Sequence, residues 1–201
     1  MFTLLGHIAR RTVRRVVRIY YPRIEISGGE KIPAAGPVLL TANHANSLID
    51  PVLLGIVARR PVHFLSKAPL FDVPVLGVVL RSLGMIPAYR GSDDAAQIKR
   101  NLESLAVGAE YLVQGEAIGI FPEGKSHDLP RVEQVRTGAA RIAVQAAKDG
   151  ASGLKIIPVG INFQRKESFR SAVWVRIGEP IDVSAALDAN EIGRASCRER
   201  V

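Results

Sequence analysis

Short apolar runs alternate with segments of helical periodicity over most of the chain. Runs of four to eight apolar residues bounded by turn residues are typical of buried strands. They predict strands at residues 37–42, 62–65, 85–89, 117–121, 154–161 and 172–177. Apolar residues recurring every three or four positions predict helices at 51–58, 75–83, 93–113 and 138–147, and a last helix begins at Ser184 behind a capping Asp182. This alternation predicts a single α/β domain in which helices flank a mostly parallel sheet.

The first 22 residues show a different pattern, with an apolar face and a basic face. The apolar positions recur at steps of three and four: Phe2, Leu5, Ala9, Val13, Val16, Val17 and Tyr20. Five arginines between positions 10 and 18 exclude both a membrane span and the apolar core of a signal peptide. The segment is therefore predicted to be a basic amphipathic helix, which either lies on an anionic membrane surface or docks on its own domain.

Most of the excess positive charge belongs to this helix. The 27 Lys and Arg residues outnumber the 19 Asp and Glu residues by eight, and six of the arginines lie in residues 1–23 with no acid among them. Residues 24–190 carry a net charge of only +1. Because a nearly neutral domain offers no extended basic face, we expect no nucleic-acid partner.

Composition and the final residues bear on the setting and extent of the domain. A chain that is 47% hydrophobic and 23% charged is not disordered. The single cysteine, Cys197, excludes an internal disulfide and a cysteine-based zinc cluster, so we expect a cytoplasmic setting. Residues 193–201 have neither apolar period nor turn signals and are interpreted as a non-native tail. Residues 23–192 are then a domain truncated at its C-terminus.

The main candidate for chemistry follows the strand at 37–42, where Asn43 and His44 precede Asp50 and Pro51. A histidine suits a general base near neutral pH, and a carboxylate that accepts its other ring N–H fixes its tautomer. Two side chains that are six residues apart do not lie on the same face of a regular helix. His44 and Asp50 therefore meet only if the segment between them forms an irregular turn. The alternative is that Asp50 only caps the following helix, with Pro51 in its first position.

Two other polar segments also follow predicted strands. Phe121 to Asp128 contains Glu123, Gly124 and Lys125, which are able to hold a substrate through side chains and backbone amides. Arg90 ends the strand at 85–89, where a guanidinium either clamps a phosphate or is simply solvated. The run from Ile157 to Gly160 is interpreted as core or as a substrate wall.

Together these blocks resemble the phospholipid and glycerol acyltransferase family, which includes the lysophosphatidic acid acyltransferases. The resemblance covers about residues 23–180. It rests on these matches to the family motifs: Asn43, His44 and Asp50; Gly84, Ile86 and Arg90; Phe121, Pro122, Glu123 and Gly124; Ile157, Pro158 and Val159.

The chain departs from the commoner family pattern in two places. Five residues separate His44 from Asp50 where four are more common, and Lys125-Ser126 stands where Thr-Arg is more common. A branch with the longer spacing and a Phe-Pro-Glu-Gly-x-Ser-His-Asp block is similar, and it includes glycerol 3-phosphate and dihydroxyacetone phosphate acyltransferases. The identity of the acceptor therefore stays open.

The resemblance implies an enzyme that moves an acyl group from acyl-CoA or acyl carrier protein to a glycerol-phosphate-type acceptor, such as 1-acylglycerol 3-phosphate or glycerol 3-phosphate. It implies no cofactor and no metal, and a peripheral location on the cytoplasmic face of a membrane, which favours a bilayer contact for the N-terminal helix. His44, oriented by Asp50, would deprotonate the acceptor hydroxyl without a covalent enzyme intermediate.

The resemblance also implies roles for the other polar residues. Arg90 would hold the acceptor phosphate, and Lys125 or Arg136 would add positive charge. Glu123, next to Gly124, would position either the acceptor hydroxyls or the loop itself. Lys67 would contact a phosphate or the phosphopantetheine arm, unless it is only an exposed loop residue.

Three alternatives remain at the level of sequence. A metal-dependent hydrolase would use these five side chains: His44, Asp50, Glu123, His127 and Asp128. A serine hydrolase would use Ser47 or Ser126, although the chain has no Gly-x-Ser-x-Gly motif. A non-enzymatic lipid-surface protein would use only the N-terminal helix.

Overall fold

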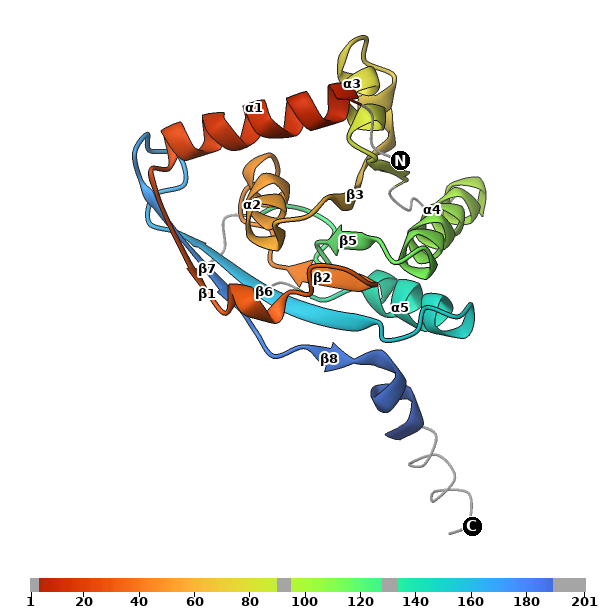
Figure 1. The fold of residues 1–201 in the computed structure, drawn as a ribbon. Coiled ribbons are helices and arrows are strands. Elements are labelled where there is room, and N and C mark those ends of the chain that lie inside the picture. The colour runs from red at the N-terminus through yellow and green to blue at the C-terminus, as the bar shows by residue number, and fades with distance from the viewer. Residues whose placement is uncertain (1–3, 90–94, 128–133, 190–201) are drawn as a thin grey trace, which may run out of the picture.

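Eight strands of the described chain form one sheet, whose order is β1-β7-β6-β2-β5-β3-β4 with β8 beside β6 (Figure 1). The computed structural model describes residues 4–89, 95–127 and 134–189. The strands are β1 (Arg23–Ser27), β2 (Val38–Ala42), β3 (Val62–Lys67), β4 (Ile86–Ala88), β5 (Ala117–Ile120), β6 (Lys155–Phe163), β7 (Ala172–Ile177) and β8 (Ile181–Asp182). Neighbouring strands from β6 to β4 are parallel, whereas β7 and β8 run antiparallel to β6.

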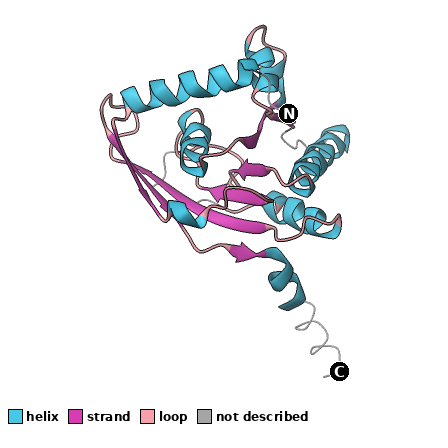
Figure 2. Cartoon of the chain, in the orientation of Figure 1, coloured by secondary structure: helices cyan, strands magenta, loops and turns pink. Residues whose placement is uncertain are grey.

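Helices cover both faces of this sheet (Figure 2). They are α1 (Leu4–Tyr20), α2 (Ile49–Ala58), α3 (Leu76–Ser82), α4 (Ala95–Val113) and α5 (Gly138–Lys148), with short 3-10 helices η1 (Gly29–Lys31) and η2 (Ala68–Phe71). Leu40 packs into the core on the α2 side, and Leu39 packs with Leu112 of α4 and Ile142 of α5. Successive strand residues point to opposite faces, so β2 is buried on both sides and reads as a continuous apolar run.

The predicted α/β fold with a mostly parallel sheet is confirmed. The expected strands and helices are present, and those of their ends that lie within the described residues shift by at most two positions. Asp182 also caps the last helical segment, residues 183–189, by accepting the N–H of Ala185 at 3.1 Å. Two strands were not expected. β1 is an edge strand with mostly exposed residues, and β8 has only two residues, so neither produces an apolar run.

Helix α1 packs across α2 and α3, and its arginines do not all face away from the domain (Figure 1). Arg10 donates to the carbonyl of Leu83, and Arg14 donates to that of Gly55. Gly6 and Val17 are the buried residues of the helix. The basic arc expected from the sequence is therefore divided, with part of it bound to the domain. In the described part of the chain, no helix is both long and apolar enough to cross a membrane.

Candidate active site

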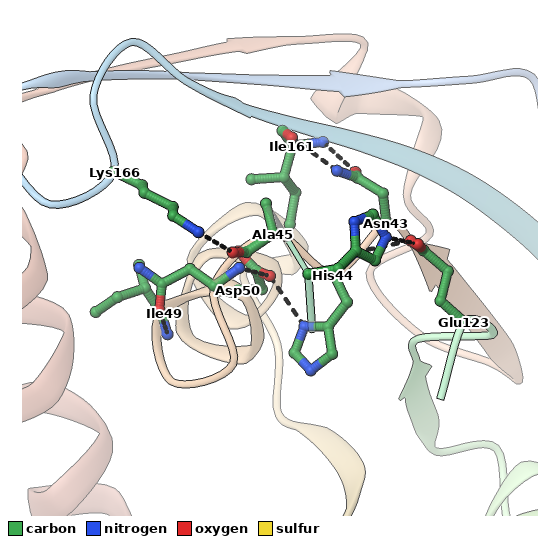
Figure 3. Close-up of polar contacts among 10 residues, drawn as sticks. Asn43, His44, Ala45, Ile49, Asp50, Glu123, Ile161 and Lys166 are labelled. Atoms are coloured by element: carbon green, nitrogen blue, oxygen red, sulfur yellow. Dashed lines mark hydrogen bonds and ion pairs between the residues drawn. The ribbon is translucent and has the colours of Figure 1, made fainter. Parts of the chain in front are cut away.

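The candidate site begins where β2 ends, and the side chain of Asn43 fixes that point to β6 (Figure 3). The Asn43 amide nitrogen donates to the carbonyl of Ile161 at 2.9 Å, and the N–H of Ile161 donates to the Asn43 amide oxygen at 2.7 Å. This pair of hydrogen bonds resembles the pairing between two neighbouring strands, with a side-chain amide in place of a peptide group. It holds the start of the following loop at the carboxyl edge of the parallel strands, where α/β folds commonly place ligands.

The imidazole of His44 and the carboxylate of Asp50 meet, as the irregular-turn hypothesis required. His44 Nδ1 lies 3.0 Å from Asp50 Oδ2, which also accepts the backbone N–H of Asn46 at 2.7 Å. Helix α2 starts at Ile49 behind Leu48, so Asp50 lies inside the first turn. The alternative in which Asp50 only caps this helix is therefore wrong. Its side chain folds back onto the loop before the helix.

Asp50 is fully buried, and its surroundings act on its ionisation in opposite directions. Burial is the largest effect and raises the pKa of the carboxyl above its ordinary value, while hydrogen bonds from His44, Asn46 and Ala45 lower that pKa in part. A carboxylate beside Nδ1 favours the tautomer with a proton on that nitrogen. Nε2 of His44 is then the nitrogen with a free lone pair.

Aromatic rings fix the plane of the His44 imidazole. The ring stacks on Phe121 with centroids 4.0 Å apart and planes 13° apart, and Phe64 lies behind Phe121 at 6.2 Å. Phe64 packs directly over Gly119, where a Cβ atom would come within 2.1 Å of the Phe64 ring. The His44 side chain keeps 14% of its surface exposed, so the imidazole is held but not sealed from solvent.

The loop after β5 holds the backbone of His44. Glu123 is buried, and its Oε1 accepts the N–H of His44 at 3.0 Å while its Oε2 contacts Nε2 of His127. The N–H of His127 donates in turn to the carbonyl of His44 at 3.1 Å. Of the two roles expected for Glu123, these contacts correspond to positioning the loop. His127 is the member of this cluster that sequence reasoning named only for a hydrolase; its spacing of four from Glu123 was the available signal.

Gly124, Lys125 and Arg136 lie together beside this loop. Gly124 has a φ of +75°, which glycine adopts without steric cost, and its N–H donates back to the carbonyl of Phe121 at 3.0 Å. Arg136 lies over Gly124, where an added Cβ would be 3.2 Å from its Nε, and the Arg136 N–H donates to the carbonyl of Pro122. Lys125 and Arg136 are both exposed. The structure therefore places two cations next to the loop that holds His44.

Lys67 lies two strands from β2, at the end of β3. It lines a cavity of about 630 Å³ at the ends of β3 and β4, together with the basic residues Arg81 and Arg100 and one acid, Asp72. Three cations against one carboxylate suit an anionic ligand. Arg90, expected to bind phosphate, lies outside the described residues, one residue beyond the cavity-lining Tyr89.

Only some of the residues named for the alternative functions lie within the described part of the structure. Ser47 and Ser126 are exposed, and Asp128 lies outside the described residues. Among residues 4–89, 95–127 and 134–189, no group of three His, Cys, Asp or Glu side chains is arranged to hold a metal ion. Cys197 and the suspected tail also lie outside the described part.

A family model described as Acyltransferase matches residues 23–162, and the chain belongs to this family. The motifs that suggested the resemblance lie within the matched segment. Its first residue is also the first residue of β1, so the match leaves α1 outside.

Individual relatives of the chain are also named as acyltransferases. Glycerol-3-phosphate O-acyltransferase 1 of Saccharomyces cerevisiae is 37% identical over 92% of this chain and 36% of its own length. A lyso-ornithine lipid O-acyltransferase of Pseudomonas aeruginosa is 35% identical over 64% of this chain and 44% of its own length. The chain thus spans less than half the length of either relative.

A solved structure shares the fold. The crystal structure of the 1-acyl-sn-glycerophosphate (LPA) acyltransferase, PlsC, from Thermotoga maritima superposes with a TM-score of 0.59 at 22% identity, covering 88% of this chain and 72% of that one. This likeness confirms the architecture around the site.

Proposed function

We propose that this domain transfers a fatty acyl group from a thioester donor to a hydroxyl of a glycerol-phosphate-type acceptor. The observation that carries the proposal is the His44–Asp50 pair, held at 3.0 Å at the carboxyl edge of a parallel sheet in a chain of the Acyltransferase family. The donor is acyl-CoA or acyl carrier protein. The reaction requires neither a metal nor an organic cofactor.

His44 acts as a general base in the proposed reaction. Its Nε2 accepts the hydroxyl proton while the acceptor oxygen attacks the thioester carbonyl carbon, and the tetrahedral intermediate then expels the thiolate. The thiolate takes the proton from the imidazolium, so that an ester and a free thiol leave and His44 is restored. Asp50 holds the Nδ1–H and stabilises the transient positive charge, which lowers the barrier without forming a bond to the acyl group.

The acceptor phosphate is proposed to bind near the basic residues that surround the site. Arg90, with its planar fork, is the proposed main contact, and Lys67 on the neighbouring cavity wall is a second contact for phosphate or phosphopantetheine. Lys125 and Arg136 add positive charge on the loop that carries Glu123 and Gly124. The similarity to glycerol-3-phosphate O-acyltransferase 1 of Saccharomyces cerevisiae favours glycerol 3-phosphate over 1-acylglycerol 3-phosphate and dihydroxyacetone phosphate as acceptor.

The enzyme is proposed to work at the cytoplasmic face of a membrane, attached by residues 1–22 without spanning it. Arg11, Arg15 and Arg18 are exposed on α1, and no acidic residue lies on that helix. Exposed cations beside exposed apolar residues favour an interface rich in anionic lipid.

The direct test is product identification. The purified chain is incubated with palmitoyl-CoA or palmitoyl-acyl carrier protein and, separately, with glycerol 3-phosphate, dihydroxyacetone phosphate, 1-acylglycerol 3-phosphate or lyso-ornithine lipid, and products are identified by mass. An acylated phosphate-bearing acceptor that is absent with His44→Ala supports the proposal. Thioester consumption that yields only free fatty acid would indicate a hydrolase instead, and acylation of lyso-ornithine lipid alone would replace the acceptor class.

A further inference from the structure

The outward side of α1 carries large aliphatic side chains as well as arginines, while two other arginines of the helix bind the domain. Large aliphatic side chains are exposed at Leu4 (78%), Ile8 (55%), Val16 (57%) and Ile19 (60%). Several large aliphatic side chains exposed on one helix commonly mark an interaction site. Because Arg10 and Arg14 are bound to backbone carbonyls of the domain, the helix cannot turn this side inward without breaking both bonds.

A second apolar group lies near the N-terminal end of α1, in residues 73–78, which contain the turn before α3 and the first residues of that helix. Val73, Val75, Leu76 and Val78 are exposed by 39% to 76%. Arg10 donates to the carbonyl of Leu83, the residue directly after α3, so the C-terminal end of α3 is bonded to α1. Figure 1 shows the segment around α3 at the N-terminal end of α1, on the side of α1 that faces away from the sheet.

The turn that presents Val75 is tight and strained. Val75 has a φ of 64°, a region that β-branched residues rarely adopt, yet its side chain remains 76% exposed. The turn is closed by hydrogen bonds from Leu76 to Pro74 at 2.7 Å and from Gly77 to Val73 at 2.9 Å. A Cβ at Gly77 would lie 2.1 Å from the carbonyl oxygen of Phe71. The backbone of this turn therefore packs closely against Phe71, and Val75 keeps a strained φ with its side chain facing solvent.

Charge indicates what covers this surface. Exposed Arg11, Arg15 and Arg18 lie along α1 with no acid on the helix, while residues 73–78 bring no charge of their own. Aliphatic side chains beside a row of cations match the acyl chains and phosphates of an anionic bilayer. We propose that residues 73–78 form a second bilayer-contacting element, which acts together with the outward side of α1.

This inference deepens the proposed attachment of α1 and assigns the second element a task. A single helix in the interface leaves the domain free to tilt about it, whereas contacts at two places fix the tilt. The other end of α1 reaches the active-site loop through Tyr21, whose hydroxyl donates to the carbonyl of Lys166, and through Lys166, whose Nζ donates to the carbonyl of Ala45 at 3.3 Å. Fixing the tilt of α1 thus fixes the orientation of the loop that holds His44.

The test uses an environment-sensitive fluorophore on single cysteines in a Cys197→Ser background. The labelled positions are Ile8→Cys on α1, Val78→Cys on the second element, and Ile181→Cys on β8 as a control of similar exposure on a distant element. Each protein is mixed with phosphatidylcholine vesicles that contain or lack phosphatidylglycerol. We expect a blue shift, and quenching by lipids brominated in the acyl chain, at positions 8 and 78 but not at 181.

The outcomes distinguish a bilayer contact by residues 73–78 from membrane attachment through α1 alone. A shift at position 8 alone overturns the second element and leaves the α1 attachment standing, whereas no shift at either position overturns both. A shift at position 78 that appears without vesicles as protein concentration rises means that a second copy covers the surface, which also overturns the inference. The acyl-transfer assay with a water-soluble acceptor tests the chemistry independently of these labels.

Unlabelled variants provide a check that does not depend on a probe. Val78→Glu should bind anionic vesicles about tenfold more weakly in sedimentation, since the transfer of one valine side chain and the added charge are lost. Ile181→Glu should bind like the wild type. Both variants are compared only if their thermal unfolding midpoints agree. Equal vesicle binding by the two variants would contradict a role for residues 73–78.

Discussion

At the scale of single residues, His44 is held on several sides at once. Asp50 binds its Nδ1, Phe121 stacks on its ring, and Glu123 and His127 bind its backbone N–H and carbonyl. This constraint leaves Nε2 as the ring nitrogen suited to take a proton. Such preorganisation is what a general base requires, because each misplacement of the base lowers the rate of proton transfer.

Replacing His44 by Ala should lower kcat by about 10² to 10⁴-fold, the usual contribution of a general base. The measurement is steady-state transfer from palmitoyl-CoA, with far-ultraviolet circular dichroism as the control for folding. Near-wild-type turnover in a folded His44→Ala protein would remove His44 from the mechanism.

Asp50→Asn should lose activity without losing stability. Burial raises the pKa of Asp50, so its contribution to stability is present below about pH 4 and is lost as pH rises through the folded-state value. Above the folded-state pKa the protein therefore bears the cost of a buried charge, which Asn does not impose. We expect kcat to fall by about 10²-fold or more while the free energy of unfolding at pH 7 stays equal or rises. A marked loss of stability together with retained turnover would contradict both the catalytic role of Asp50 and the expected effect on stability.

Glu123→Gln distinguishes the two roles that the sequence left open for this residue. If Glu123 acts on the backbone of His44, kcat should fall about tenfold or more while the acceptor KM stays unchanged. Glu123→Ala should be worse than Glu123→Gln, because the amide oxygen still accepts the His44 N–H. The exposed Glu179→Gln serves as the control. A rise in acceptor KM with unchanged kcat would indicate contact with the acceptor instead.

At the scale of elements, His63 links β3 to its neighbours without taking part in the site. It is buried, its Nδ1 lies 2.7 Å from the carbonyl of Gly84 before β4, and its ring stacks on Tyr111 of α4 at 3.9 Å. Burial lowers the pKa of this imidazole below its ordinary value. The folded protein therefore keeps His63 neutral at a pH where the unfolded chain takes up a proton.

Acidification should destabilise the fold through His63. A depressed folded-state pKa contributes stability above the unfolded value of 6.5, and that stability is lost as pH falls towards the folded value. The slope contributed by this group approaches about 1.4 kcal/mol per pH unit. Urea unfolding at several pH values between 7 and 5 measures it, with His63→Gln as the comparison. An unchanged slope in His63→Gln would assign the pH dependence to another group.

At the scale of the whole molecule, most of the excess positive charge belongs to the N-terminal segment that contains α1, which also exposes large aliphatic side chains. The remainder of the chain up to residue 190 is nearly neutral. An attraction between this side and anionic lipid acts over a Debye length of about 10 Å at 0.1 M salt, so it weakens as salt is added.

Vesicle sedimentation should show this dependence directly. Removing two exposed charges in the double variant Arg11→Gln, Arg15→Gln should weaken binding to anionic vesicles about 30-fold at low salt, at roughly 1 kcal/mol per charge. The matched double variant Arg141→Gln, Lys148→Gln on α5 should bind like the wild type. Binding that is insensitive to salt, or equal in the two variants, would contradict electrostatic attachment through α1.

The sequence alone determined the order of the elements and the positions of the motif residues, because apolar periodicity and turn chemistry are local properties. It placed strands and helices to within two residues and selected His44, Asp50 and Glu123. It did not predict β1, whose exposed edge position leaves no apolar run. It predicted the strand at 172–177 but not that this strand, β7, runs antiparallel to β6, because the connection between them is too short for a crossover helix.

Only the tertiary structure decided how those residues are used. Asp50 lies within helix α2 and folds back to His44, and the carboxylate of Glu123 binds the His44 backbone across 79 positions of sequence. Likewise, the pattern of α1 gave an apolar arc and a basic arc but not which of them faces the domain. Docking against α2 and α3 decided it, since carbonyls at Gly55 and Leu83 offered acceptors to two arginines and left aliphatic side chains outside. The physical reason is that periodicity records the chemistry of each face of an element, whereas the partner of that face comes from distant parts of the chain.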